Sequence, residues 1–423
     1  MNDSAPVKVS HDVARRFILG RQGLWPGRRW AGADGTETAM REIEYLQLDP
    51  LQIVARSHDI KLYSRVIGYT PGMWEEAAYR RRRFFDWGGW LAVRPMEELP
   101  YWRTVMHRER DGNSRLQALA QEHSEAITEM RSALHERGEI TNRDFEMADR
   151  KRTASYRSRK DSGLALYYLW ITGEVMTHHR ERFERVYALT EQVAPAHLIC
   201  ECSDDETDRF LIRKEIAFGG LSRLNRTAES YRRGDPAGTA NRLRAEMLAS
   251  GEIIEVHVDG WKFVHYALGR DAAALHDLSA GRIPAEWEPL ESTTEEEVTF
   301  LAPLDNVSAR GRAKILFGVD YVWEVYKPEH LRKYGYYALP ILWHDRIVGR
   351  FDSRLDRAAN TLVILGFWLE ESVLGNDEMF ADALARGFAR FATFLGAEKL
   401  NAAAIKEPVL RRRLSGRRRR TAE

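Results

Sequence analysis

The sequence predicts an α+β fold that is mainly helical and ends in a β-rich region. Two observations point to it. A pattern of helix, glycine and paired strands occurs twice in the middle of the chain, and the residues from about 292 onward are rich in Val, Ile, Tyr and Phe, as strands are. The 423 residues exceed what one hydrophobic core usually supports. We therefore expect several domains.

The repeated pattern is typical of the last part of a winged helix. In the first copy, helical periodicity up to Ile171 is followed by Gly173 and two strand-like stretches. In the second copy, helical periodicity up to Leu248 is followed by Gly251 and two more such stretches. Glycine is favoured where a helix ends in a left-handed residue. The segment 133–141 supplies the earlier part of the first copy: a helix, a short strand and a threonine that can cap the next helix.

A winged helix is a helix-turn-helix variant whose last helix can enter the major groove of DNA. Arg157, Arg159 and Lys160 precede or lie on that helix in the first copy, whereas the second copy has fewer basic residues there. Winged helices also serve as protein contacts and as spacers. The pattern alone therefore leaves DNA binding open for the first copy and favours a structural role for the second.

Linkers that contain acidic residues and proline divide the chain. The domains that we predict are an N-terminal winged-helix-like domain at 1–120, a second winged helix at 121–198, a third winged helix at 205–283, a β-rich C-terminal domain at 292–405 and a basic tail at 406–423. The predicted architecture is thus a set of tandem winged helices followed by a β-rich domain.

The charges nearly cancel but are segregated along the chain. Lys and Arg total 64 and Asp and Glu total 63, which gives a net charge of +1. Such a balance argues against a nucleic-acid partner, yet basic runs can neutralise phosphates locally. The main basic runs are Arg80–Arg83, Arg157 to Lys160, Arg411–Arg413 and Arg417–Arg420. Each run alone is explained more simply as a solvated face or a tail. Together they predict a confined basic channel.

Several classes of protein are excluded by what the sequence lacks. No apolar run approaches the roughly 20 residues that span a bilayer, and the first residues do not form a secretory signal. Cys200 and Cys202 are too few for a disulfide framework or a zinc site. His178-His179 and His58 have no partners at metal-ligand spacing, and no phosphate-binding glycine loop occurs. We expect a cytoplasmic monomer with no metal, no cofactor and no membrane partner.

The stretch Tyr45–Pro50 holds the most unusual polar pattern. Gln47 and Asp49 are separated by one apolar residue, so in an extended chain both point to the same side. The following proline favours an extended conformation at Asp49, and the flanking apolar residues would partly desolvate the pair. An amide and a carboxylate so placed can hold a water molecule and stabilise positive charge nearby. The alternative, which the sequence alone favours, is that Asp49 caps a helix over Leu51–Ala55.

Three blocks of sequence carry a resemblance to a known family. The first is Leu46-Gln47-Leu48-Asp49, followed by Ile53–His58 and Leu62–Arg65. The second is Phe183–Leu189. The third consists of Leu301–Asn306, Leu316–Gly318, Glu324–Tyr326, Arg332–Leu342 and Val348–Arg350. These blocks cover nearly the whole chain in order, and the sequence resembles the YcaQ-like (AlkZ and AlkX) winged-helix DNA glycosylases, in the subgroup with a Gln-apolar-Asp motif.

The resemblance implies tandem winged helices around a DNA channel and hydrolysis of the N-glycosidic bond of N7-alkylated purines in DNA repair, extending to the unhooking of interstrand crosslinks. It assigns the catalytic motif to Gln47 and Asp49. The implied partner is double-stranded DNA with alkylated bases or crosslinks, and the implied location is the nucleoid. The DNA contacts that we predict are basic and polar residues in or near these blocks: Arg56, Ser57, His58, Arg65, Arg157, Arg159, Lys160, Arg310, Arg312, Arg332, Lys333 and Arg350.

The sequence departs from the family at three places. Gly89 stands where relatives have a histidine. Ser155–Lys160 replaces a Trp-rich stretch, and Ser308–Arg312 replaces the family's Trp-Asp-Arg sequence. All three fall around the expected channel. They leave two alternatives, a non-catalytic winged-helix DNA-binding protein such as a regulator, and a set of protein-interaction modules. The intact Gln47-Leu48-Asp49 motif and the third block favour the glycosylase.

Overall fold

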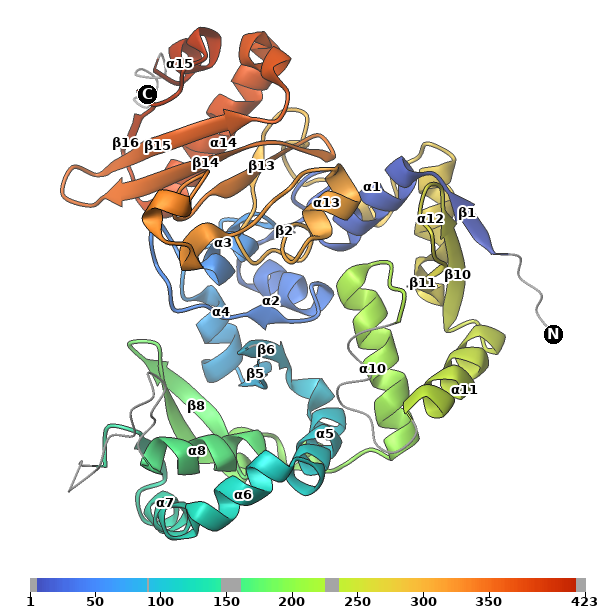
Figure 1. The fold of residues 1–423 in the computed structure, drawn as a ribbon, viewed down its shortest axis with the longest axis vertical. Coiled ribbons are helices and arrows are strands. Elements are labelled where there is room, and N and C mark those ends of the chain that lie inside the picture. The colour runs from blue at the N-terminus through green and yellow to red at the C-terminus, as the bar shows by residue number, and fades with distance from the viewer. Residues whose placement is uncertain (1–5, 90, 146–160, 225–235, 416–423) are drawn as a thin grey trace.

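The computed structural model describes residues 6–89, 91–145, 161–224 and 236–415 (Figure 1). It is a mixed α+β molecule, as predicted. The N-terminal unit lies near the centre of the view, with the C-terminal sheet above it, the second unit below it and the third unit to the right. The predicted DNA contacts Arg157, Arg159 and Lys160 and the last residues of the basic tail lie outside the described residues.

The N-terminal unit is built from short elements. They are β2 (Trp30–Ala31), α2 (Gly32–Glu42), β3 (Leu46–Gln47), α3 (Ser57–Tyr63), β4 (Val66–Ile67), α4 (Met73–Glu75), the π-helix η1 (Glu76–Arg80), β5 (Phe84–Trp87), β6 (Ala92–Pro95) and α5 (Leu99–Gly112). β3, β6 and β5 form a three-stranded antiparallel sheet in that order, and β2 pairs in parallel with β4. Every residue of β5 and β6 is buried, so neighbouring units enclose this small sheet.

The second unit contains the first copy of the repeated pattern. Its elements are α6 (Ser114–Glu122), α7 (Ser124–Arg137), β7 (Glu139–Thr141), α8 (Asp161–Ile171), β8 (Val175–Glu181), β9 (Glu184–Leu189) and α9 (Thr190–Val193). The predicted helix, glycine and paired strands are confirmed, because Gly173 follows α8 with a φ of +79° and β8 pairs with β9. The sheet order is β7-β9-β8. In β8 the register shifts between Thr177 and His179, so His178 is the extra residue of a β-bulge.

The third unit contains the second copy. Its elements are α10 (Asp204–Gly219), α11 (Pro236–Ala249), β10 (Ile253–Val258), β11 (His265–Leu268) and α12 (Ala272–Ser279). Gly251 follows α11 with a φ of +75°, as predicted. α10 begins with a capping box, in which the Ser203 hydroxyl accepts from the Glu206 amide and the Glu206 carboxylate accepts from the Ser203 amide.

The first described elements, β1 (Val7–Val9) and α1 (His11–Arg21), pack with the third unit. β1 pairs in parallel with β10, with Val7 opposite Val256, and completes a three-stranded sheet in the order β1-β10-β11. Phe17 and Leu19 of α1 share a hydrophobic core with α12 and with β13 of the C-terminal unit. This pairing across the chain is not anticipated by the division that we predicted at residue 120.

The C-terminal unit is the predicted β-rich region, with helices packed on it. Its elements are β12 (Thr299–Phe300), α13 (Arg312–Phe317), β13 (Leu339–Trp343), β14 (Arg346–Asp356), β15 (Thr361–Leu369), α14 (Glu378–Leu395), β16 (Lys399–Asn401) and α15 (Pro408–Ser415). The strands form one sheet in the order β12-β13-β14-β15-β16. Phe388 and Phe391 of α14 pack on Phe300 and Phe351 of the sheet, with ring centroids 4.8–6.2 Å apart. Within the described ranges, no helix has both the length and the apolar character needed to cross a bilayer.

Candidate active site

Gln47 and Asp49 lie at the open edge of the small sheet in the N-terminal unit. Gln47 is the last residue of β3 and lies opposite Ala92 of β6, and the Leu48 amide donates to the Leu91 carbonyl at 3.0 Å. The motif is therefore next to the turn between β5 and β6, which contains Gly89. Gly89 is exposed, and beyond its chain neighbours no atom of the described residues lies within 4 Å of the position that a Cβ would take there. The position for which the family resemblance predicts a histidine therefore carries no side chain beside the motif.

Asp49 is held in a tight turn. One of its carboxylate oxygens, Oδ1, accepts a hydrogen bond from the Leu51 amide at 2.8 Å. The alternative that Asp49 caps a helix over Leu51–Ala55 is wrong, because the next helix, α3, begins only at Ser57. Asp49 is partly buried, and burial raises the pKa of its carboxyl, although the hydrogen bond from Leu51 opposes the shift. A carboxylate with a raised pKa is a stronger base than an ordinary aspartate.

His58 holds the backbone of Asp49 in place. Its Nδ1 accepts a hydrogen bond from the Asp49 amide at 3.2 Å, which requires a neutral ring. Burial, with the charges of Arg56 and Arg180 beside it, lowers the pKa of His58 to about 3. Its ring stacks on Phe183 with centroids 5.6 Å apart. His58 is 1% exposed, so we no longer propose it as a DNA contact; it positions Asp49.

We expect the buried His58 to make the protein sensitive to acid. Its pKa is about 3 when folded and about 6.5 when unfolded, so below pH 6.5 the unfolded chain binds a proton that the folded chain does not. The free energy of unfolding should therefore fall by about 2 kcal/mol between pH 6.5 and pH 4.5 from this residue alone. Urea denaturation of the wild type and of His58→Asn, whose side-chain oxygen can still accept from Asp49, measures the difference. A fall of the same size in both proteins would contradict this account.

Gln47 is held by a residue from the C-terminal unit. The Arg310 guanidinium donates to Gln47 Oε1 at 2.8 Å. Arg310 is exposed and lies in the Ser308–Arg312 stretch, where the sequence departs from its relatives. Its backbone has a φ of +55° and is followed by Gly311 at +83°. The departure thus brings a cation onto the candidate catalytic amide. Because Oε1 accepts from Arg310, the amide NH₂ is the end of Gln47 that remains available to donate.

The hairpin of the second unit is docked against this site, which the sequence did not predict. Asp86 of β5 is buried and forms ion pairs with Arg180 of β8 and, at 3.0 Å, with Arg185 of β9. Burial would raise the pKa of Asp86, but the two arginines outweigh it and lower the pKa to about 2. Phe183, at the hairpin tip, stacks on His58, and the Arg56 guanidinium is 4.5 Å from its ring centroid. In the sequence, the only sign of this contact is an acidic residue, Asp86, beside Trp87.

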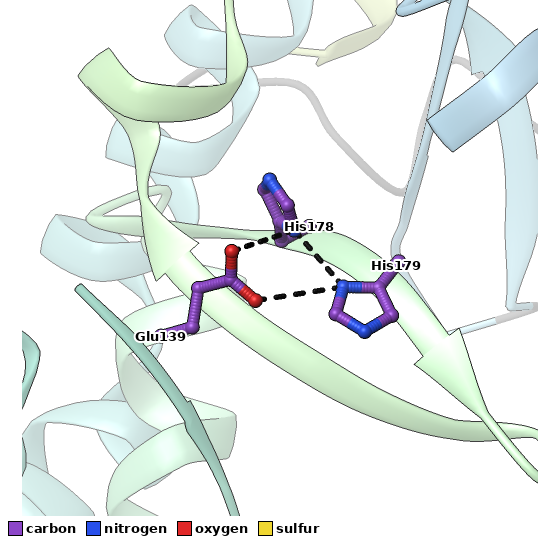
Figure 2. A group of neighbouring side chains, drawn as sticks. All are labelled: Glu139, His178 and His179. Carbon is purple, nitrogen blue, oxygen red and sulfur yellow. Dashed lines mark hydrogen bonds and ion pairs between the residues drawn. The ribbon is translucent and has the colours of Figure 1, made fainter. Parts of the chain in front are cut away.

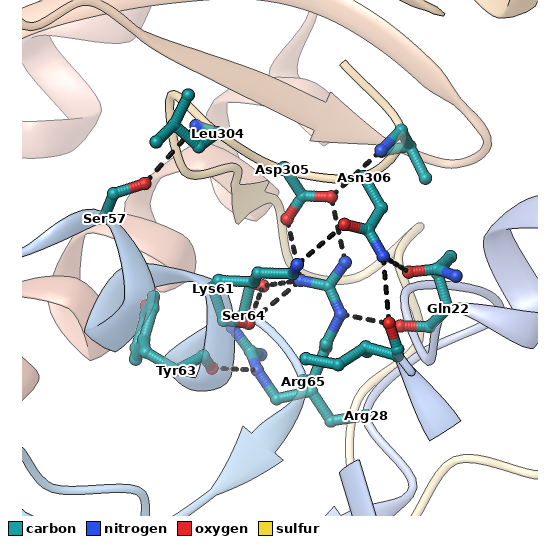
Figure 3. Close-up of polar contacts among 12 residues, drawn as sticks. Gln22, Arg28, Ser57, Lys61, Tyr63, Ser64, Arg65, Leu304, Asp305 and Asn306 are labelled. Atoms are coloured by element: carbon teal, nitrogen blue, oxygen red, sulfur yellow. Dashed lines mark hydrogen bonds and ion pairs between the residues drawn. The ribbon is translucent and has the colours of Figure 1, made fainter. Parts of the chain in front are cut away.

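A buried polar cluster ties the N-terminal unit to the C-terminal unit (Figure 3). Arg65, which follows α3, donates to both carboxylate oxygens of Asp305 at 2.8 and 2.9 Å and to the Gln22 carbonyl at 2.7 Å. Lys61 donates to Asn306 Oδ1 at 2.7 Å, and burial, with nearby arginines, lowers its pKa to about 7 although Asp305 opposes the shift. This cluster fixes the start of the loop that carries Arg310.

Two predicted DNA contacts belong to this cluster instead. Arg65 has no exposed surface, and Ser57 is 2% exposed, with its hydroxyl accepting from the Leu304 amide at 3.3 Å. We therefore do not carry either forward as a DNA contact. A sequence motif cannot tell an arginine that binds phosphate from one that binds a buried carboxylate, because the partner here lies 240 residues away along the chain.

The third resembling block lies close to Asp49. The Tyr337 hydroxyl donates to the Ala55 carbonyl at 3.1 Å, and burial, followed by the negative charge of Asp49, raises the pKa of Tyr337. The Asp352 carboxylate accepts from the amides of Tyr336 and Tyr337 at 3.0 and 3.2 Å. Gly335 precedes them with a φ of +97°, and a Cβ there would lie 2.1 Å from Asp352. The glycine is thus required for the turn that presents Tyr337.

The remaining predicted contacts divide by exposure. Arg350 is 2% exposed and pairs with Glu370, so it too has a structural role and is not carried forward. Arg56, Arg312 and Arg332 are partly exposed, and Lys333 is exposed. Arg312 donates to the Gly219 carbonyl at 2.8 Å, and Arg332 to the Lys327 carbonyl at 2.9 Å.

A cavity of about 530 Å³ is lined by Arg310, the residue that holds Gln47. It is bounded by the end of α10, by the β10–β11 hairpin and by the loop between β12 and α13. Tyr45 stacks on Phe218 at its wall, with centroids 4.4 Å apart. Arg310 and Arg312 also line it. A cationic, aromatic-walled space therefore adjoins the candidate catalytic motif.

Comparison with known proteins places the chain beside DNA glycosylases. The family model described as "DNA glycosylase AlkZ-like" matches residues 40–394, a span that includes the Gln47-Asp49 motif and the third block. Among solved structures, the DNA glycosylase AlkZ of Streptomyces sahachiroi is similar with a TM-score of 0.58 and 15% sequence identity, over 93% of this chain and 99% of that one. At this identity the second match concerns the fold alone.

Proposed function

The chain belongs to the AlkZ-like DNA glycosylase family, and from this premise we propose that it hydrolyses the N-glycosidic bond of N7-alkylated purines in double-stranded DNA. Asp49 is the catalytic carboxylate and Gln47 its partner. The observation that supports this best is the partly buried Asp49, with its raised pKa, on a turn that His58 holds, beside an amide that Arg310 orients.

The proposed substrate suits a site that offers a carboxylate. An N7-alkylated purine carries a positive charge, so it leaves as a neutral base and needs no acid to protonate it. The sugar develops positive charge at C1′ as the bond breaks, and a negative group placed there in a partly dry site stabilises that charge strongly. The ionised Asp49 fulfils this role, and it can also accept a proton from the attacking water.

Gln47 positions that water in the proposed mechanism. With its oxygen bound to Arg310, the amide offers N–H groups to the water oxygen while Asp49 receives the water's proton. Fixing a nucleophile between two groups converts a chance encounter into an oriented one. Arg310 thereby acts as a positioning residue, and its exposed side allows it to approach a phosphate of the same DNA.

The second and third units support a DNA-binding role. The order of helices and strands in the second unit, with sheet order β7-β9-β8, is consistent with a winged helix, and in the third unit β1 supplies the extra strand. We propose that both are winged helices and that the DNA contacts are Arg56, Arg310, Arg312, Arg332, Lys333 and, from the sequence alone, Arg157, Arg159 and Lys160. We further propose a monomer that acts at the nucleoid, with crosslinks as additional substrates.

Base release is the decisive measurement. A duplex with one N7-methylguanine, incubated with the protein and then cleaved at abasic sites, should yield a strand break at that position. The same duplex with uracil in place of the lesion is the matched control and should stay intact. Uracil is uncharged in DNA and would have to leave as an anion, which makes it a poorer leaving group. Tight, salt-sensitive binding without base release would identify a non-catalytic DNA-binding protein instead and refute the enzymatic proposal.

Replacing Arg310 by alanine is expected to weaken both functions of that side chain. Loss of one phosphate contact should reduce the slope of log affinity against log salt by about one, and loss of the bond to Gln47 should slow base release from bound DNA. Arg354→Ala removes an exposed arginine of β14 and is the control. Equal salt slopes for Arg310→Ala, Arg354→Ala and the wild type would show that Arg310 does not contact DNA.

A further inference from the structure

The second unit brings three metal-binding side chains together on its sheet (Figure 2). Glu139 of β7 and the neighbouring His178 and His179 of β8 point toward one another, each with a ligand atom within 4.8 Å of the others. Along the sequence the two histidines stand alone, because their partner is on a strand almost forty residues earlier. We propose that these three residues form a binding site for a divalent transition-metal ion of the zinc class.

The β-bulge in β8 makes this arrangement possible. Neighbouring residues of a regular strand point to opposite faces of the sheet, so two consecutive histidines could not both bind one ion. His178 is the extra residue of the bulge, lying between the Thr177–Tyr187 and His179–Val186 pairs. A bulge places two consecutive residues against one residue of the next strand and redirects their side chains. Here it turns both rings toward Glu139.

The distances match the edges of a metal coordination polyhedron. A tetrahedral zinc ion binds nitrogen and oxygen at about 2.0–2.1 Å, which places adjacent ligand atoms about 3.3 Å apart. The Nδ1 atoms of His178 and His179 are 2.9 Å apart. His178 Nδ1 lies 3.1 Å from Glu139 Oε1, and His179 Nδ1 lies 3.6 Å from the other oxygen, Oε2. These three separations scatter around the expected value, and the two that involve Glu139 end on different oxygens of its carboxylate. Two nitrogens that face each other so closely need a cation or a proton between them.

The ligand set identifies the class of ion. Two imidazoles and one carboxylate form the three-ligand set of many zinc sites, which leave a fourth position for water. Imidazole nitrogen suits zinc, copper and nickel, whereas magnesium and calcium prefer oxygen ligands alone. All three side chains are partly exposed, with 28%, 37% and 44% of the surface of His178, His179 and Glu139 accessible. An ion can therefore reach the site from solvent.

A bound ion would connect β7 to β8 across the intervening strand β9. β8 continues from the histidines to Arg180, which pairs with Asp86, and the hairpin ends at Phe183 against His58. The proposed metal site therefore lies on β8, the strand that holds the hairpin against the N-terminal unit. Its expected effect is to fix the bulge and to raise the thermal stability of the folded protein as the free metal concentration rises.

Titration of the metal-free full-length protein with Zn²⁺ alone, followed by calorimetry, tests the site. The wild type should bind one equivalent, and Co²⁺ in its place should give the absorption of a tetrahedral nitrogen and oxygen site. Glu139→Gln and His179→Gln should each weaken Zn²⁺ binding at least tenfold, since each removes one of three ligands. His135→Gln, at an exposed position of α7 in the same unit, should bind as the wild type does.

A second control separates this site from the cysteines. Cys200 and Cys202 are free thiols near the surface and can themselves capture zinc, so Cys200→Ser with Cys202→Ser must retain the one-equivalent binding. Circular dichroism of each variant checks that the fold is intact. No Zn²⁺ binding by the wild type, equal binding by the wild type and both ligand variants, or binding that disappears only with the cysteines would each overturn the proposal.

Discussion

Replacing Asp49 by asparagine is expected to lower base release from N7-methylguanine DNA by two to four orders of magnitude, the range typical for loss of one catalytic carboxylate or charge. Asparagine has the same shape, and its side-chain oxygen can still accept from the Leu51 amide, which Asp49 does at 2.8 Å. The turn should therefore persist while the negative charge is lost. Single-turnover rates with the enzyme in excess measure this step without a contribution from product release.

The pH dependence of the same reaction provides an independent check. The ionised carboxylate is the active form, so the wild-type rate should rise with pH and level off once Asp49 is ionised. Burial raises the pKa of Asp49, so the midpoint should lie above the ordinary value of about 3.9. The residual rate of Asp49→Asn should show no such rise. Equal rates for the two proteins, with DNA binding unchanged, would exclude Asp49 as the catalytic group.

Replacing Asp305 by asparagine is expected to destabilise the protein by about 3–5 kcal/mol, the usual effect of breaking a buried ion pair by removing one partner. Arg65 has no exposed surface and would keep its charge without the carboxylate that it binds through two hydrogen bonds. The midpoint of urea denaturation should fall accordingly. Because the pair joins two units, the transition should also become less cooperative.

Two further variants separate the pair from other causes of instability. Replacing both partners, Arg65→Met with Asp305→Leu, removes the uncompensated charge and should recover part of the lost stability. Glu378→Gln breaks an exposed ion pair with Arg412 and should cost less than about 1 kcal/mol. A double variant as unstable as the sum of its single changes would show that the two side chains do not act as a pair.

The elements that the sequence predicted are those whose signals are local. The pattern of helix, glycine and hairpin could be recognised in both copies, because the ending of a helix at a left-handed glycine depends only on nearby residues. Gly173 and Gly251 both have this conformation. The Gln47-Asp49 motif could be located but not interpreted, since sequence alone favoured a helix cap. The hydrogen bond that the Asp49 amide donates to His58 and the one that Arg310 donates to Gln47 hold the motif in its observed conformation, and both come from tertiary structure.

The predictions that did not survive concern burial. Residue type and position in the resembling blocks predict DNA contacts at Arg65, Arg350, Ser57 and His58, yet the fold encloses all four side chains. Whether an arginine binds a phosphate or a carboxylate depends on what the chain brings beside it from far away. The same reasoning explains why the sequence shows no partner for His178 and His179 at metal-ligand spacing: neither the bulge that aligns them nor the distant Glu139 is visible in their local sequence.

The parallel pairing of β1 with β10 has a consequence for how the protein is made. β1 leaves the ribosome before β10, which follows roughly 250 residues later, and at 5–20 residues per second this is a delay of roughly 10–50 s. Throughout that interval the nascent strand lacks the neighbour that satisfies its backbone. The sheet of the third unit is therefore completed by a strand that was made roughly 250 residues earlier. A bulky fusion partner attached directly before Val7 would interfere with the step that completes it.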